Sequence, residues 1–243
     1  MGQKQRIDQQ PGFVLHTHPY RETSLIVEVF SRDHGRLPLL AKGARRPMSP
    51  VRGVLMAYQP LLIDWSGSGE VKTLVRAEWT GGQPLLSGRA LLCGYYLNEL
   101  LIKLLAREDP HTALFDDYAA LLRALPDATR PEPLLRRFEL GLLEQLGYAV
   151  LLDREADTDL PVRAEGACRY IIERGPVGAA AAESDAASPG VLSGQTLLDM
   201  HAGRFDDPRT LHESKALLRH LIQHHLGGQS LHSRRMFKEL QTL

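Results

Sequence analysis

Cysteine is scarce in this chain: its 243 residues include only Cys93 and Cys168, which lie far apart in the sequence. Two isolated cysteines supply neither a disulfide framework nor a four-thiolate metal site, which is typical of proteins in a reducing cytosol. No stretch approaches the roughly 18 uninterrupted apolar residues of a membrane-spanning helix, and the first ten residues have no apolar signal core. These absences favour a soluble, cytoplasmic protein with no membrane partner.

Motifs of the common enzyme classes are missing as well. The chain has no phosphate-binding GxxxxGK[ST] loop, no GxSxG motif, no dinucleotide glycine fingerprint and no CxxC. His212-Glu213 lacks the second histidine of a zinc-protease HExxH motif. His220 and His224 lie one helical turn apart, but no second ligand pair accompanies them, so a solvated face is favoured over a metal site. The sequence predicts no catalytic residues, no cofactor and no metal.

The net charge is zero, but the charges are segregated along the chain. Residues 1–60 carry nine Lys/Arg and four Asp/Glu, and residues 209–243 carry six and two. Residues 106–208 carry ten Lys/Arg and nineteen Asp/Glu. Basic ends and an acidic middle indicate a dipolar molecule with one face suited to a polyanion.

The most informative basic stretch runs from Gly35 to Pro47, with Arg52 a few residues beyond it. A short apolar strand at 37–41 is followed by four cations that glycine, alanine and proline separate, namely Lys42, Arg45, Arg46 and Arg52. Small residues between cations predict a mobile backbone that follows a phosphate chain. A solvated surface loop is the alternative, and the segregated charge of the whole chain favours phosphate binding.

Alternating apolar residues and turn signals predict five short strands before Pro84. The expected strands are 13–16, 23–30, 36–41, 58–65 and 70–79, and residues 1–11 are expected to be loosely ordered. Five short strands with long excursions favour a small closed or partly closed barrel over a sandwich. Four aromatic residues of this region are candidates for stacking on bases, although each is more typical of a core or rim: Tyr20, Phe30, Tyr58 and Trp65.

Helical periodicity begins after Pro84. Residues 87–106 are apolar on nearly every side, which predicts a buried helix in a second, helical domain. Within it, Glu99 beside Asn98 requires a partner, and a structural ion pair or a cap between helices is the expected role. Further helices are predicted at 112–125, 134–146, 196–201, 208–226 and 233–240.

Residues 151–192 interrupt the helical pattern with acidic loop, a short strand near 169–172 and an Ala/Ser-rich segment, 178–190, that is expected to be mobile. Before this insert, Arg136-Arg137-Phe138 places two arginines beside an aromatic residue in an otherwise acidic region. Because arginine pairs with carboxylates bidentately, these residues are candidates for binding an acidic peptide that ends in an apolar residue.

Short motifs follow one another over nearly the whole chain: GFVLH at 12–16, RETSL at 21–25, AKGAR at 41–45, GEVKTL at 69–74, YLNELL at 96–101, LRRFE at 135–139, LGY at 146–148, LGG at 226–228 and LHSR at 231–234. Together they resemble the bacterial RecO recombination mediators. The resemblance implies an α+β protein with an OB-fold β-barrel over residues 1–84 and an α-helical domain over 85–243. Many members carry a four-cysteine zinc finger in the insert, where this chain has only Cys168, so the insert is expected to be finger-like without zinc.

The resemblance also implies a non-catalytic function in DNA repair and recombination. Such proteins bind single- and double-stranded DNA, anneal complementary strands and, with RecR, help load RecA onto strands coated by the single-stranded DNA-binding protein SSB. They capture the acidic, Phe-ending tail of SSB on the helical domain, for which Arg136, Arg137 and Phe138 are the expected residues.

DNA contacts are expected from cations, because a protein that anneals any sequence holds phosphates and leaves base edges free. The main candidates are Arg36, Lys42, Arg45, Arg46 and Arg52, and the secondary ones are Lys4, Arg6, Arg21 and Lys72. A C-terminal patch of Arg234, Arg235 and Lys238 either holds another strand or faces solvent. Two other hypotheses stay open: an adaptor that bridges SSB and RecR without binding DNA, and a metal-dependent nuclease that uses Asp116 and Asp117.

Overall fold

The computed structural model describes residues 6–148, 150–179 and 189–241, with side chains up to residue 236. Two compact units make up the chain. The first unit comprises the residues up to Ala128 together with those from Leu231 onward, and the second unit is Thr129–Ser230. Lys4 and most of the Ala/Ser-rich segment lie outside the described residues.

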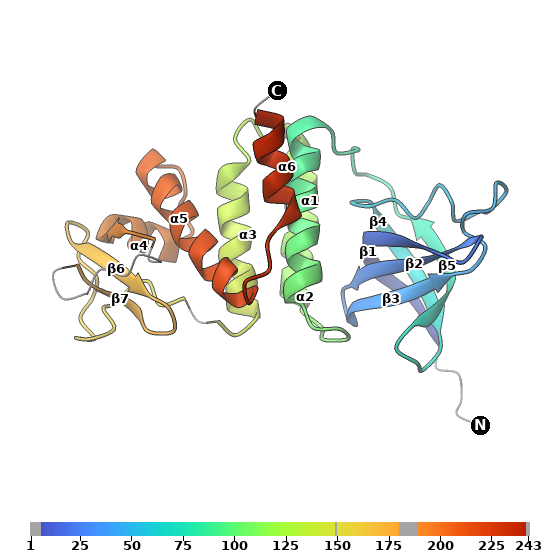
Figure 1. Ribbon diagram of the computed structural model, residues 1–243, viewed down its shortest axis with the longest axis horizontal. Helices are drawn as coiled ribbons and strands as arrows, with labels where there is room; N and C mark the ends of the chain where they lie inside the picture. The colour runs from blue at the N-terminus through green and yellow to red at the C-terminus, as the bar shows by residue number, and fades with distance from the viewer. Residues whose placement is uncertain (1–5, 149, 180–188, 242–243) are drawn as a thin grey trace. The chain divides into compact units, whose positions relative to one another are not determined.

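The first unit contains a closed five-stranded barrel with strand order β1-β2-β3-β5-β4 (Figure 1). Its strands are β1 (Arg6–Tyr20), β2 (Ser24–Ser31), β3 (Gly35–Ala41), β4 (Pro60–Ser66) and β5 (Lys72–Trp79). β3 and β5 pair in parallel, and the other neighbours pair antiparallel. The predicted α+β fold with a five-stranded barrel is therefore confirmed.

β1 is longer than its sequence pattern suggests. Residues 6–11, expected to be loosely ordered, belong to this strand because Arg6, Ile7 and Gln10 pair with β4. A bulge lies between Ile7 and Gln10, where the backbone N–H of Gln9 donates to the buried Asp64 carboxylate at 2.7 Å. Pairing with a distant strand thus orders a segment that has no apolar alternation of its own.

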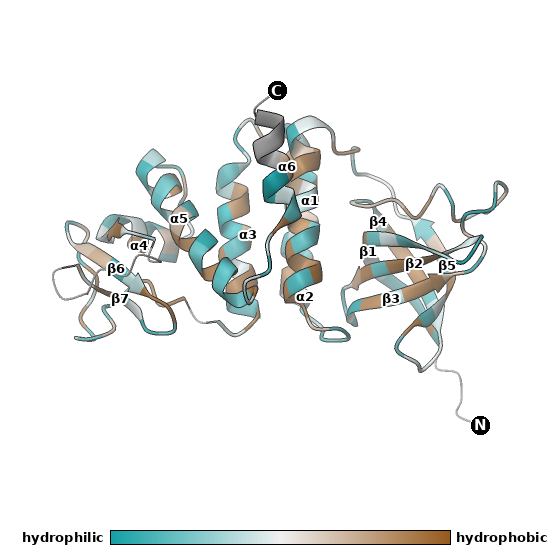
Figure 2. Cartoon of the chain, viewed as in Figure 1, coloured by the Kyte–Doolittle hydropathy of each residue, from teal (hydrophilic) through white to brown (hydrophobic). Residues whose placement is uncertain are grey.

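The barrel core is built from inward-facing aliphatic residues and one tryptophan. Figure 2 shows hydrophobic residues along β2 and β3, which together contribute half of the buried core residues. The buried core residues are Val14, Val27, Val29, Leu37, Leu39, Ala41, Ala44, Leu61, Ile63 and Trp65. The inner faces of the strands enclose this core. Apolar and polar residues therefore alternate along a strand only where its outer face is exposed to solvent.

The outer face of β1 and β2 is covered by helix α2 (Thr112–Ala124). Phe13 and Phe30 are partners on the two strands, and each packs against Phe115 and Tyr118 of α2 with ring centroids 5.2–6.1 Å apart. Helix α1 (Gly88–Leu104) contacts β1 as well, because the Asn98 side chain donates to the Leu15 carbonyl at 2.8 Å and accepts from the Tyr118 hydroxyl. The barrel and these two helices therefore form one packed unit, and the short helix η1 (Leu125–Asp127) follows α2.

Glu99 on α1 holds the last helix, α6 (His232–Gln241). Its carboxylate accepts hydrogen bonds from the backbone N–H groups of His232 and Ser233 at 2.8 and 2.9 Å, and from the Ser233 hydroxyl at 2.6 Å. Lys103 forms an ion pair with the same carboxylate at 3.2 Å. Glu99 therefore caps the N-terminus of α6, which confirms the structural role expected for it.

Replacement of Glu99 by glutamine is expected to destabilise the protein by about 1–2 kcal/mol at neutral pH, because it removes charge-assisted hydrogen bonds. Burial alone would raise the pKa of Glu99, but the hydrogen bonds from Ser233, His232 and Lys103 outweigh it and lower the pKa. A carboxyl whose folded pKa is depressed stabilises above its unfolded pKa of about 4.3, and this contribution is lost as pH falls through the folded value.

Thermal unfolding of wild type and Glu99→Gln from pH 7 to pH 3 tests this expectation. The difference in melting temperature should be largest at pH 7 and shrink below about pH 4. A difference that is the same at both pH values would show that the carboxylate charge at Glu99 is not what holds α6.

The described residues of the second unit form three helices and a small sheet. The helices are α3 (Glu132–Gln145), α4 (Gly194–His201) and α5 (Pro208–His225), and the sheet has the order β7-β6-β8. Its strands are β6 (Ala167–Ile171), β7 (Gly175–Gly178) and β8 (Val191–Ser193), which occupy the predicted insert. Cys168 is buried in β6, and Cys93 is buried in the first unit; they form no disulfide.

The described residues contain neither a metal-binding cluster nor a membrane-spanning helix. Within residues 6–148, 150–179 and 189–236, no three His, Cys, Asp or Glu side chains come together to bind a metal ion. In the same ranges, every helix is too short or too polar to span a bilayer.

Candidate nucleic-acid interface

The basic loop, defined as residues 42–56 between β3 and β4, is a succession of hydrogen-bonded turns. Backbone N–H groups of Arg46, Ser49 and Arg52 donate to the carbonyls of Gly43, Arg46 and Ser49 at 3.0, 3.1 and 3.2 Å. Four apolar residues anchor these turns to the barrel core: Ala44, Val51, Val54 and Leu55. The loop is thus built with a defined shape, in contrast to the mobile chain that its small residues suggested.

The cations of the basic loop point away from these anchors. Lys42, Arg45, Arg46 and Arg52 are all exposed. This arrangement explains the composition of the loop. The small residues form the turns, the apolar residues anchor them, and the surface positions can carry charged side chains. A phosphate backbone that follows the loop would meet positive charge at several successive positions.

The β1–β2 turn lies beside the basic loop and adds a fifth cation, Arg21. The backbone N–H of Arg45 donates to the Thr23 carbonyl at 2.8 Å, and its guanidinium reaches the carbonyls of Arg21 and Glu22 at 3.4 and 3.3 Å. Arg21 is exposed, and its guanidinium carbon lies 5.2 Å from the centre of the Tyr20 ring. We call Arg21, Lys42, Arg45, Arg46 and Arg52 together the basic end.

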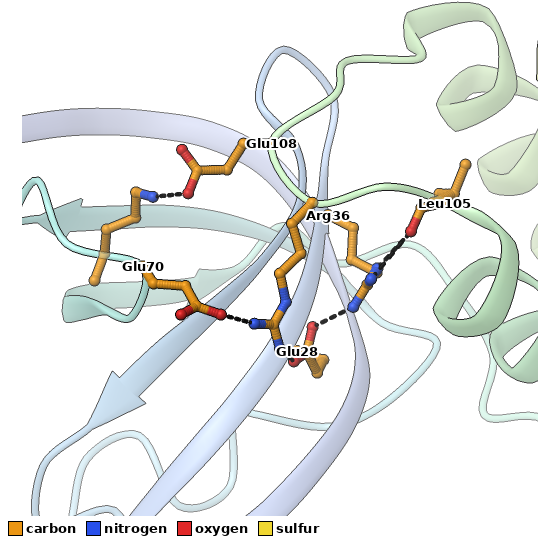
Figure 3. A network of polar contacts seen from close by, with 7 residues as sticks. Glu28, Arg36, Glu70, Leu105 and Glu108 are labelled. Atoms are coloured by element: carbon orange, nitrogen blue, oxygen red, sulfur yellow. Dashed lines mark hydrogen bonds and ion pairs between the residues drawn. The ribbon is translucent and has the colours of Figure 1, made fainter.

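Arg36 and Lys72, also predicted to contact DNA, lie in a different environment, a network of ion pairs and hydrogen bonds. Arg36 is labelled in Figure 3. Arg36 stands at the start of β3, whereas the basic loop follows the end of this strand. Its guanidinium donates to the Glu28 carboxylate at 3.0 Å and to the Leu105 carbonyl at 3.0 and 3.2 Å, and its side chain is only 13% exposed. The geometry therefore favours a structural role for Arg36.

The same network fastens residues 105–109 to the barrel. Arg107 pairs with the buried Glu28 at 2.9 Å and with Glu70, and Lys72 pairs with Glu108 (Figure 3). The backbone of this segment is attached to the barrel as well, because the Glu108 N–H donates to the Arg36 carbonyl at 2.8 Å. Residues 105–109 connect α1 to α2, so these ion pairs fix both helices on the barrel.

Gly35 shows how closely this segment approaches the barrel. Its φ of +65° favours glycine, and a Cβ placed there would lie 2.1 Å from the Asp109 carbonyl oxygen. In the sequence Gly35 is recognisable as a turn residue, but the contact that excludes every other side chain comes from a segment more than 70 residues away.

The remaining predicted DNA-binding cations that the structure describes, Arg6, Arg234 and Arg235, lie apart from the basic end. Arg6 stands at the opposite end of β1 from Arg21, where it pairs with Asp8 at 2.7 Å and approaches Asp64 at 4.0 Å. Arg234 is half-buried and Arg235 exposed on α6, which Glu99 caps. Lys4 and the side chain of Lys238 lie outside the described residues.

The aromatic candidates for base stacking are mostly interior. Phe30, Tyr58 and Trp65 are buried, in agreement with the core role considered for them, and Tyr20 is half-buried. The exposed aromatic residues of the first unit include Trp79 at the end of β5 and Tyr95 on α1. Sequence alone did not identify these two, because their patterns continue an apolar strand and an apolar helix.

Asp116, half of the metal pair in the nuclease hypothesis, is bound by an arginine. The Arg32 guanidinium donates to its two carboxylate oxygens at 3.0 and 2.8 Å, and these hydrogen bonds lower the pKa of Asp116 despite partial desolvation. An arginine that occupies both oxygens competes with any cation for this carboxylate. The pair is therefore assigned to fixing α2 beside β2.

The three consecutive residues considered for acidic-peptide binding lie in different environments within the second unit. Arg136 is buried with its guanidinium on the Glu139 carboxylate, and Phe138 is buried in the core of the unit. Arg137 is exposed, and its guanidinium donates to the Gly203 carbonyl at 2.9 Å. Of the three, Arg137 is the one whose charge is presented to solvent.

The geometry and the comparisons with known proteins point to the same class. An OB-like barrel with a basic end defines a protein built on a nucleic-acid-binding type of domain. Family models described as "Recombination protein O N terminal" and "Recombination protein O C terminal" match residues 6–83 and 85–235.

Full-length relatives agree with these family models. "DNA repair protein RecO" of Aromatoleum aromaticum is 66% identical over 243 residues, that of an Azoarcus species 61% over 243 and that of Dechloromonas aromatica 54% over 246, each covering all of both chains. The chain belongs to the RecO family of DNA repair and recombination proteins, a non-catalytic mediator family. The predicted family is thereby confirmed, while the division into domains at residue 84 stays a prediction.

Proposed function

We propose that this chain binds single- and double-stranded DNA through its basic end, anneals complementary strands and, with RecR, helps load RecA onto SSB-coated single strands. The observation that carries the proposal is the gathering of five exposed cations on two adjoining turns of the barrel. These proposed partners put the action of the protein at the nucleoid in the cytoplasm.

The basic end suits annealing because its groups contact phosphates and not bases. Lysine and arginine side chains neutralise the backbone whatever the sequence, so the base edges stay available for pairing. Anchored turns also reduce the conformational entropy that a mobile loop would lose on binding. With about five phosphates engaged, the logarithm of the single-strand binding constant should fall against log salt with a slope of roughly −3.5.

The test compares wild type with a Lys42→Ala/Arg45→Ala/Arg46→Ala variant in single-strand binding across a salt series and in annealing of complementary strands. A flatter salt slope with weaker binding, together with slower annealing, is the expected outcome. Weak binding by wild type, or a variant that keeps the full slope, would favour the adaptor hypothesis, in which the chain bridges SSB and RecR without holding DNA.

We further propose that the second unit receives the acidic tail of SSB, with Arg137 as the pairing group. Arg137 is exposed, and it lies in a chain segment, residues 106–208, that carries nine more acidic than basic residues. Arg137 therefore offers an exposed positive charge to a peptide carboxylate within an otherwise acidic segment. Buried Arg136 supports this site indirectly, because its ion pair with Glu139 lies within α3.

The Arg137→Ala variant is expected to bind a fluorescent acidic peptide ending in Phe about tenfold more weakly, the effect of one charge-assisted hydrogen bond. Arg130→Ala removes a charge from another exposed arginine of the same unit and serves as the matched control. Arg136→Ala is expected instead to lower the melting temperature, since it removes a buried ion pair. Unchanged peptide affinity in Arg137→Ala would refute this assignment.

A further inference from the structure

The basic loop carries one side chain that its charge does not explain. Met48 is 93% exposed, more than any other large hydrophobic residue in the part of the chain that the structure describes. Single exposed apolar residues are common on protein surfaces and need no function by themselves. Met48 differs because of how the backbone presents it and what surrounds it.

A β-turn fixes the position of Met48. The Ser49 N–H donates to the Arg46 carbonyl at 3.1 Å, so Arg46 to Ser49 form a hydrogen-bonded turn with Pro47 and Met48 at its two central positions. Proline is favoured at the first central position because its ring sets φ near the value that the turn needs. The side chain of Met48 therefore projects from a defined corner.

Anchors hold this corner on both sides. Ala44 is buried in the barrel core before the turn, and Val51 packs against the same core after it. A further turn, closed by the Arg52 N–H on the Ser49 carbonyl at 3.2 Å, continues directly from the first. The barrel thus supports Met48 from beneath, which a solvated loop of small residues would not do.

Cations flank the methionine. Arg45 and Arg46 precede it and Arg52 follows it, and all three are exposed. A strand whose phosphates contact these arginines would pass over the corner with its bases close to Met48. The combination of an apolar tip with cations on both sides is the arrangement of proteins that insert a side chain between base steps.

We propose that Met48, supported by Pro47, is a wedge that inserts between neighbouring bases of the DNA strand held by the basic end. The inference rests on the proposed DNA-binding function and adds a second kind of contact to it. The thioether chain is unbranched and polarisable, so it fits against the face of any base. It has no strong hydrogen-bond donor or acceptor, so it opens a base step without selecting a sequence.

This wedge has a consequence for annealing. A single strand stacks on itself, and stacking must open locally before bases can meet a complementary strand in a new geometry. A side chain inserted at one step unstacks it while the neighbouring arginines keep hold of the phosphates. The basic end would then hold a strand and also expose base edges for pairing.

The test uses a single-stranded oligonucleotide that contains 2-aminopurine, whose fluorescence rises when it is unstacked. Full-length wild type, Met48→Ala, Met48→Leu and Met56→Ala are compared at saturating protein. Met56 is the matched control, because it is a 42% exposed methionine at the other end of the same loop. Binding constants are measured on the same DNA across a salt series, which reports phosphate contacts independently of base stacking.

The 2-aminopurine fluorescence should rise when wild type, Met48→Leu or Met56→Ala binds. It should not rise when Met48→Ala binds. The affinity of Met48→Ala should fall about fivefold with an unchanged salt slope, because apolar contact is lost and phosphate contacts remain. An undiminished signal in Met48→Ala, or an equal loss in Met56→Ala, would overturn the wedge and leave the basic end intact. If the Lys42/Arg45/Arg46 variant keeps the wild-type salt slope, both the wedge and the proposed DNA site fail.

Discussion

Replacing Lys42, Arg45 and Arg46 by alanine is expected to reduce the salt slope of single-strand binding by about two, because each phosphate contact on a single strand contributes about 0.7. At about 0.1 M salt this corresponds to a roughly hundredfold loss of affinity. The remaining cations of the basic end, Arg21 and Arg52, should retain a shallow slope. Annealing of complementary strands should slow in parallel, since both activities depend on the same phosphate contacts.

The fold of this variant should be preserved. The three side chains are exposed, while Ala44 and Val51 anchor the loop through apolar contacts that the substitutions do not touch. Arg45 also donates to the carbonyls of Arg21 and Glu22, so single variants separate its effect on the β1–β2 turn from its effect on DNA.

A charge-matched control is available on the second unit. The Arg130→Ala/Lys215→Ala/Arg219→Ala variant removes three exposed cations from α5 and the segment before α3. It should keep the wild-type slope, because these residues lie outside the basic end. Equal flattening in both variants would show that the slope reports overall charge and not a site on the barrel.

Replacing Arg36 by alanine is expected to lower the free energy of unfolding by about 3 kcal/mol, near the lower end of the cost of breaking a buried ion pair. The substitution removes one of the two arginine partners of buried Glu28, leaving Arg107, and it removes the two hydrogen bonds to the Leu105 carbonyl. Residues 105–109 would lose part of their attachment to the barrel, and with it the positions of α1 and α2. Chemical denaturation of wild type and variant measures the effect.

Two further measurements test whether the role of Arg36 is structural. Glu70→Ala alters the same network at its edge, where the Glu70 side chain is 73% exposed, and should change stability by less than about 1 kcal/mol. Arg36→Ala measured at a temperature where it is folded should keep the wild-type salt slope. A stable Arg36→Ala variant with a flattened slope would instead make Arg36 a phosphate ligand, as its position in the sequence suggests.

The sequence by itself determined the architecture and the family. Alternation in residues 23–30 and 36–41 predicts strands that the barrel contains, and the apolar stretch at 87–106 predicts α1 to within two residues at each end. These elements follow from local periodicity, which each segment carries without help from its neighbours. The charged Glu99 within an apolar helix likewise predicted a structural ion pair or a cap between helices, because a buried carboxylate requires a partner.

Only the tertiary structure decided which cations face solvent. Arg36 and Arg45 look alike in the sequence, yet the first is held by Glu28 and the Leu105 carbonyl, while the second lies exposed on the basic end. The neighbours Arg136 and Arg137 differ in the same way, because α3 turns one toward the interior and the other toward solvent. The Leu105 carbonyl that holds Arg36 is 69 residues away in the chain, and such a partner leaves no trace in local composition. The role of an arginine is therefore set by the long-range contacts that the fold assembles around it.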